Sequence, residues 1–356
     1  MSIDNYSAQF KIKVGDAVLK KKRIYLDTKY WVFMRDALQG KASDVQTKIY
    51  GLLKDLVKNE VAICPLSPHL FQELMNIGDK EQRLKTAEAM DELSQQVCFI
   101  SPLSIVGQEL LSFVRNCQAK SEGKSLFNPT KYVFTKIAFA LGEIYPSVKG
   151  IPNEQMDDIR IQFFDYLSKF TLVEMLKTMK GDDFPLWNRE NLIAKLNQGK
   201  DNNQNWESFH EVFMHEIAGL LDLIKDDIEK LCIYLYENDV GGCVSSEEIR
   251  QSDYVRLLSN RICQAFDQHK INKELPYFHV NASLYAFIRY NKSQRYKEND
   301  LIDFSHVAWA LPYCNAFFTE KPLHDWICNK PLKLNEVYGT KVFWRESDVL
   351  DALDNL

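Results

Sequence analysis

The stretch "DFSHVAWALPYCNAFFTEK" (303–321) decides the expected fold. Its first part repeats apolar residues at helical spacing after an acid, Asp303, and its last part, "NAFFTE" (315–320), is a short β-rich run that ends on a second acid, Glu320. A helix followed directly by a buried strand is typical of layered α/β proteins. Carboxylates at both ends of such an apolar unit have little structural use, because burying them is costly unless cations or hydrogen bonds compensate their charge. The stretch therefore predicts an α/β fold with chemistry near a strand end.

Further β-rich runs occur toward both ends of the chain. They are "RIYLD" (23–27), "VAICPL" (61–66), "QVCFISPL" (96–103) and "TKVFW" (340–344). Charged stretches with helical periodicity separate them, as in "TKIYGLLKDLVKNE" (47–60). Strands that alternate with helices predict a parallel sheet, here of four or five strands.

The middle of the chain has a different pattern. Apolar residues recur every three or four positions in segments such as "FTKIAFALGEIY" (134–145), which predicts helices, and the polar stretch "NQGKDNNQNWES" (197–208) predicts a loop. We therefore expect a discontinuous α/β domain, made of residues 1–104 and 291–356, interrupted by an almost wholly helical insertion at 105–290.

Composition indicates an ordinary globular protein. The 356 residues are 46% hydrophobic and 26% charged, and the net charge of −5 argues against a protein that coats nucleic acid over its whole surface. There is no apolar run of membrane-spanning length, and "MSIDNYSAQFKIKVGD" (1–16) lacks the apolar region of a secretory signal, so we expect no membrane span and no secretion. The eight cysteines are scattered without a CxxC pair, which favours reduced thiols in the cytoplasm.

Acids end or follow the expected strands in four separate segments. Asp27 closes "RIYLD", Glu73 lies in the helix after the second strand, Asp303 opens a helix, and Glu320 closes "AFFTE". In a parallel sheet, ligands collect at the carboxyl ends of the strands. Each acid alone is explained by a helix cap, a solvated helix face or a turn. Together they repel one another unless cations neutralise them, and hard oxygen donors favour Mg²⁺ or Mn²⁺ over zinc.

Three segments carry a resemblance to a known family. "IYLDTKYW", "ICPLSPHLFQELMN" and "NDLIDFSHVAWALPYCNAFFTEK" resemble successive signature segments of PIN-like domain nucleases, over about 23–104 and 296–346. The resemblance implies a PIN-like Rossmannoid three-layer fold and metal-dependent hydrolysis of phosphodiester bonds, usually in RNA. It assigns catalysis to Asp27, Glu73, Asp303 and Glu320, and metal binding to Asp27, Glu73 and Asp303 with Asp300 as an auxiliary ligand. In the family, an acid often precedes the strand that here ends on Glu320, and this chain has Asn315 at that position.

Substrate contacts are expected from two kinds of residue. "IRYNKSQRYK" (288–297) mixes Arg and Lys with two tyrosines just before Asp300, which suits a phosphate backbone with stacked bases, although a solvated charged surface has the same composition. Threonines beside the acids are candidates for hydrogen bonds to carboxylates or phosphate, or only to the local backbone. The expected substrate-binding residues are Thr28, Arg289, Lys292, Arg295, Asn315 and Thr319.

The function predicted from these patterns is a metal-dependent endoribonuclease, with a toxin or a defence effector among the possible settings. A haloacid-dehalogenase-type phosphatase needs a second acid two residues after Asp27, where this chain has Lys29, and no glycine-rich nucleotide-binding motif follows any strand. The alternative left open is a catalytically inactive PIN-like scaffold that acts through its helical insertion. Aromatic residues of the insertion, such as Trp187, Trp206 and Phe209, offer a candidate surface for a homodimer or a partner protein.

Overall fold

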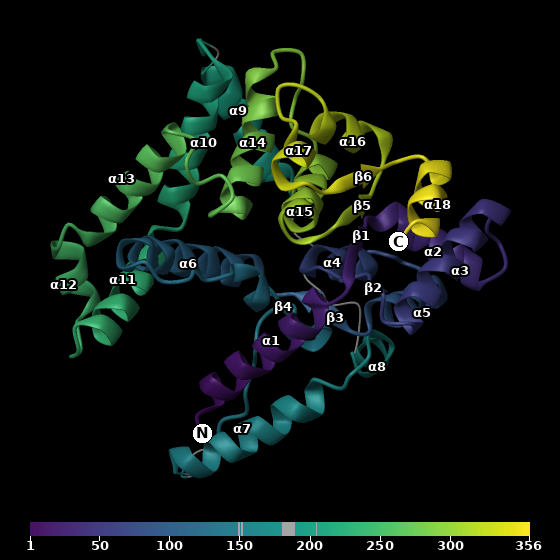
Figure 1. Cartoon of the computed structure of the whole chain (residues 1–356), viewed down its shortest axis with the longest axis horizontal. Coiled ribbons are helices and arrows are strands. Elements are labelled where there is room, and N and C mark those ends of the chain that lie inside the picture. Colours follow the sequence, from purple (N-terminus) through teal and green to yellow (C-terminus); the bar gives the residue numbers. More distant parts are fainter. Residues whose placement is uncertain (149, 151, 180–188, 204) are drawn as a thin grey trace. The chain divides into compact units, whose positions relative to one another are not determined.

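A four-stranded parallel sheet joins strands from the two ends of the chain (Figure 1). Its strands, in spatial order, are β2 (Ala62–Ile63), β1 (Lys22–Leu26), β5 (Ala316–Phe318) and β6 (Lys341–Phe343). Leu26 pairs with Phe318, and Phe318 with Phe343, so the carboxyl ends of the last three strands are level. The strands form here because "IYL" and "AFF" are fully buried runs of aliphatic and aromatic residues. The predicted α/β fold with a parallel sheet is confirmed for these four strands.

The fifth predicted strand is shorter than expected. β3 (Val97–Phe99) meets the chain beyond β2 at a single parallel bridge between Leu66 and Cys98, and its other edge pairs antiparallel with β4 (Phe134–Lys136). The prediction of a helix over 134–145 is therefore wrong: 134–136 is a strand, followed only by a short 3₁₀ turn, η2 (Ile137–Phe139). The edge of β3 supplies partners for this backbone, and such a tertiary contact overrides a short helical pattern.

The sheet belongs to a unit formed by Met1–Pro102, Thr130–Trp187 and Trp309–Leu356, called unit 1 here. α2 packs on α3 and α5, α18 on α3, α8 on α5, and α1 on β4 and α7. Phe99, Phe134 and Trp309 are fully buried, and the rings of Phe99 and Trp309 stack with centroids 5.1 Å apart. The helices of unit 1 are α1 (Ile3–Leu19), α2 (Thr28–Leu38), α3 (Asp44–Lys58), α4 (Pro68–Met75), α5 (Lys80–Ser94), η1 (Pro129–Tyr132), α7 (Asn153–Leu167), α8 (Leu172–Thr178), α16 (Lys321–Cys328), α17 (Leu334–Tyr338) and α18 (Glu346–Asp354).

In unit 2, formed by Leu103–Pro129 and Asn188–Ala308, the regular elements among the described residues are helices. α10 packs against α14 and α13, where the ring of Phe213 meets that of Phe266 edge-on at 5.9 Å. Its helices are α6 (Pro102–Glu122), α9 (Glu190–Asn202), α10 (Phe209–Leu223), α11 (Lys225–Asp239), α12 (Ser246–Gln251), α13 (Tyr254–Asp267), α14 (Pro276–Tyr290) and α15 (Glu298–Tyr313), the last of which crosses the unit boundary after Ala308.

This division differs from the expected one. The computed structural model describes residues 1–148, 150, 152–179, 189–203 and 205–356, so Trp187 lies outside the described residues. Residues 130–187 fall in unit 1 rather than in the insertion because β4 pairs with β3, and α7 and α8 pack on unit 1 helices. Residues 291–308 fall in unit 2. The predicted loop at 197–208 begins as helix, since α9 continues to Asn202.

All eight cysteines are free, and four of them are buried. Within the described residues, no helix is both long enough and apolar enough to cross a membrane.

Candidate active site

Asp27 lies where β1 ends and α2 begins. Its backbone N–H donates to the carbonyl of Phe318 at 3.1 Å, which continues the pairing of β1 with β5, and its side chain caps α2 by accepting from the backbone N–H of Lys29 at 2.9 Å. The second carboxylate oxygen accepts a 2.6 Å hydrogen bond from the Thr319 hydroxyl. Asp27 is only 6% exposed and Thr319 is fully buried. Two donors thus hold a buried carboxylate in one orientation at the strand end.

This hydrogen bond spans the point where the order of the sheet reverses. From β1 the chain goes to β2 on one side and then to β3 beyond it, whereas β5 and β6 lie on the other side of β1. Asp27 follows β1 and Thr319 follows β5, so the pair straddles this reversal at the carboxyl ends of the strands. In open α/β sheets, that position is where ligands bind.

Glu73 reaches the same region from α4. Ser67 caps this helix and Pro68 is its first residue: the Ser67 hydroxyl accepts from the backbone N–H of Leu70 at 3.2 Å. The Ser67 hydroxyl also bonds that of Tyr25 in β1 at 2.7 Å, which ties α4 to the central strand. Glu73, in the second turn, accepts a 2.5 Å hydrogen bond from the hydroxyl of Thr28, the neighbour of Asp27. The structure thus brings Asp27, Glu73, Thr28 and Thr319 together.

Three carboxylates act on the buried hydroxyl of Tyr30 near Asp27. Tyr30, in α2, is fully buried, and burial is the main cause that raises the pKa of its hydroxyl well above the usual range. The carboxylates of Asp27, Glu346 and Asp348 raise that pKa further, since a tyrosinate would be repelled by them.

Two other predicted residues lie on either side of β5. Glu320 follows Thr319 at the start of α16 and is exposed, without a side-chain cap on that helix. Asn315 precedes β5, where its side-chain oxygen accepts from the backbone N–H of Arg23 at 2.9 Å. Because β1 and β5 are parallel, Asn315 lies at the amino ends of these strands, whereas Asp27 lies at their carboxyl ends. The substrate role expected for Asn315 is therefore revised: its side chain anchors the start of β5 to β1.

Asp300 and Asp303 lie in unit 2. α15 begins at Glu298, so Asp303 is in its second turn and does not open the helix as predicted. Asp300 is 6% exposed, and its carboxylate accepts from the backbone N–H of Lys297 at 2.8 Å. Burial raises the pKa of the Asp300 carboxyl. This local hydrogen bond is that of a helix cap, and the ligand roles of Asp300 and Asp303 stay predictions.

The basic stretch 288–297 has a structural explanation. Arg289 forms an ion pair with Glu216 of α10 in which both side chains are largely buried. Arg295 pairs with Asp201 at 2.8 Å. The substrate role expected for Arg289 is revised, because its guanidinium is committed to Glu216. Lys292 is exposed and stays a candidate.

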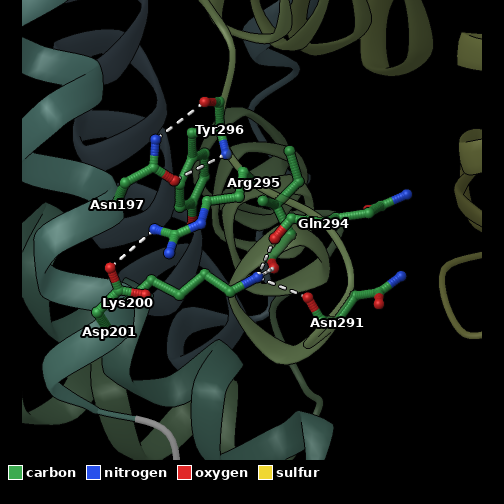
Figure 2. A network of polar contacts seen from close by, with 8 residues as sticks. Asn197, Lys200, Asp201, Asn291, Gln294, Arg295 and Tyr296 are labelled. Atoms are coloured by element: carbon green, nitrogen blue, oxygen red, sulfur yellow. Dashed lines mark hydrogen bonds and ion pairs between the residues drawn. The ribbon is translucent and has the colours of Figure 1, made fainter.

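α9 holds this same stretch in place (Figure 2). The ammonium of Lys200, buried at 6% exposure, donates to the backbone carbonyls of Ile288, in the last turn of α14, and of Asn291 and Gln294, which follow the helix. Asn197 exchanges two 3.0 Å hydrogen bonds with the backbone of Tyr296. These contacts satisfy carbonyls that a helix end leaves without partners. The sequence offers no signal for them, since Lys200 lies in a polar run predicted as a loop.

No known protein family, curated protein or solved structure matches this chain. The site is therefore interpreted from its own chemistry. Among the described residues, no group of three or more His, Cys, Asp or Glu side chains converges as a ready metal cage. Mg²⁺ commonly keeps several waters and binds through one or two carboxylates together with substrate phosphate. Asp27 and Glu73 are donors of that type, so the residues present fit a magnesium or manganese ion.

Proposed function

We propose that the chain is a metal-dependent nuclease with a PIN-like fold, which hydrolyses phosphodiester bonds and has RNA as its expected substrate. The observation that carries the proposal is the buried hydrogen bond between Thr319 and Asp27 across the reversal point of the sheet. These contacts keep the Asp27 carboxylate buried and oriented at the edge of an open α/β sheet where ligands bind.

The chain's residues have distinct roles in this proposal. The Lys29 N–H and the Thr319 hydroxyl orient Asp27, and the Thr28 hydroxyl orients Glu73. A carboxylate has about four acceptor positions, so it can accept such bonds and still bind a cation. A divalent ion held there would lower the pKa of a bound water and neutralise charge on the phosphate. Glu320, Asp300 and Asp303 remain predicted contributors, and the proposed compartment is the cytoplasm, where free cysteines persist.

The test compares Asp27→Asn with a matched control, Asp79→Asn. Asp79 caps α5 as Asp27 caps α2, and it is exposed. Asn caps helices as well as Asp, so neither change should unfold the protein. We expect native protein and Asp79→Asn to cleave single-stranded RNA with Mg²⁺ or Mn²⁺ and not with EDTA, and Asp27→Asn to cleave at least about 100-fold more slowly, since a metal ligand loses its charge.

Equal cleavage in EDTA, or full activity of Asp27→Asn, would contradict the proposal, because Asp27 would then be only a helix cap. If no nucleic acid is cut with any metal while a partner protein binds unit 2, the scaffold alternative replaces the nuclease proposal.

Self-association of the chain also stays a prediction, and light scattering tests it.

A further inference from the structure

An aromatic residue missed by the sequence analysis lies at the same edge of the sheet. Trp344 directly follows β6, as Thr319 follows β5 and Asp27 follows β1. The backbone N–H of Thr319 donates to the carbonyl of Phe343 at 2.9 Å, so the backbone at Trp344 lies beside the residue that holds Asp27. Two strand spacings separate Trp344 from Asp27, which is about 10 Å between their backbones.

Two exposed cations flank the indole of Trp344. The ammonium of Lys321, at the start of α16, lies 5.6 Å from the ring centroid, and the guanidinium of Arg345 lies 4.7 Å from it. The Lys321 side chain is 57% exposed, and Trp344 itself is half-buried. The groups near the half-buried ring thus include two flexible, exposed cations, together with the His324 ring at a centroid distance of 6.4 Å.

The charges around Trp344 limit what this surface can bind. Lys321 also pairs with Asp325 at 2.5 Å, whereas Arg345 has no ion pair with a carboxylate within the part of the chain that the structure describes. Glu346, next to Arg345, accepts a 3.1 Å hydrogen bond from Gln46. Positive and negative groups are nearly balanced, so non-specific attraction of phosphate is weak here. The distinctive feature is the indole, and its natural ligand is another flat ring.

We propose that Trp344 is a stacking platform for an unpaired base of the substrate, and that Lys321 and Arg345 contact the adjoining phosphates. An entering base takes the place of the Arg345 guanidinium on the ring, and the guanidinium then pairs with phosphate. Bases inside a duplex have both faces covered, so this arrangement selects single-stranded nucleic acid. The inference deepens the proposed function and rests on it for the link between binding and cleavage.

The experiment measures binding without cleavage. Fluorescence anisotropy of a labelled single-stranded 12-nucleotide RNA is recorded in EDTA with native protein, Trp344→Ala and Trp344→Phe. The control in the other unit is Tyr254→Ala, which removes an exposed ring of α13, and a duplex of the same sequence is the second ligand. We expect Trp344→Ala to weaken binding of the single strand by about 5- to 150-fold, the range for losing one stacked base. Trp344→Phe, which keeps a stacking ring, and Tyr254→Ala should bind within about threefold of native, and the duplex should bind more weakly than the single strand.

A second variant covers the case in which Trp344→Ala fails to fold. Arg345→Ala changes an exposed side chain and should reduce the slope of log affinity against log salt by about one, as expected for one lost phosphate contact. Equal binding by native, Trp344→Ala and Arg345→Ala overturns the inference even if the protein cleaves RNA. Binding that depends on Trp344 without any cleavage in Mg²⁺ or Mn²⁺ supports the inference and overturns the proposed function instead. Absence of binding to any nucleic acid overturns the inference.

Discussion

Thr319→Val removes one hydroxyl from the centre of the candidate site. Threonine and valine have nearly the same shape, so the backbone bond from Thr319 to Phe343 should persist while the bond to Asp27 is lost. That bond is 2.6 Å long and has a carboxylate acceptor, which is the geometry of a charge-assisted hydrogen bond. Because Thr319 is fully buried and Asp27 is 6% exposed, water does not easily replace the lost donor. We expect the free energy of unfolding to fall by about 1.5–3 kcal/mol.

The assay is urea unfolding of metal-free protein, with two control variants. Thr319→Ser keeps the hydroxyl and loses a methyl group, for an expected loss of about 0.8 kcal/mol. Thr340→Val removes another buried hydroxyl, which donates to the uncharged carbonyls of Leu311 at 2.6 Å and Cys314 at 3.0 Å, for an expected loss of about 1 kcal/mol. Thr319→Val should also reduce cleavage, since Asp27 loses a donor that orients it. Equal stabilities for Thr319→Val and Thr319→Ser would refute the reasoning, because the hydroxyl would then contribute nothing to holding Asp27.

Two further predictions concern unit 2. Arg289→Ala should destabilise the protein by about 3–5 kcal/mol, because it leaves Glu216 buried without its cation. In thermal unfolding, the double variant Arg289→Met, Glu216→Leu should recover most of that loss. A stable Arg289→Ala variant with impaired RNA binding would restore the substrate role first expected for Arg289. Burial, with a smaller contribution from the nearby charge of His269, lowers the pKa of His279 to about 4, against about 6.5 in the unfolded chain. The unfolded state therefore binds more protons than the folded state between pH 6.5 and 4. The free energy of unfolding should fall as the pH drops through this window, by about 3 kcal/mol at pH 4. Urea titrations at several pH values check this, and His279→Gln should lose the dependence.

The sequence predicted the parts of the fold that depend on local patterns. Buried runs such as "IYL" and "AFF" are short, apolar and bounded by polar residues, so β1 and β5 were recognisable, and the cap at Ser67 follows from its position before Pro68. The acids at strand ends led to Asp27 and Glu73, and the structure bonds Glu73 to Thr28, the chain neighbour of Asp27.

The parts that were missed depend on contacts between distant residues. β4 is three residues long and becomes a strand because β3 lies beside it, which no pattern in 134–145 indicates. Arg289 has the composition of a phosphate contact, and only its partner Glu216, distant in sequence, shows that it is structural. Asn315 was assigned to the site because PIN-like domains often have an acid at that position, although β5 lies between Asn315 and Glu320 and places them at opposite ends of the strand. Trp344 was missed because its position near Asp27 depends on the order of the strands in the sheet, which places β6 beside β5.

The central claim is that the carboxylates at the end of β1 hold a divalent cation, and titration of Mn²⁺ into metal-free protein tests it most directly. Calorimetry or the loss of the free Mn²⁺ paramagnetic resonance signal gives the affinity for native protein, Asp27→Asn and the matched control Asp79→Asn. We predict binding by the native protein and by Asp79→Asn, and at least about tenfold weaker binding by Asp27→Asn. Equal affinity of all three proteins for Mn²⁺, or no binding by the native protein at millimolar Mn²⁺ with RNA present, would contradict the account.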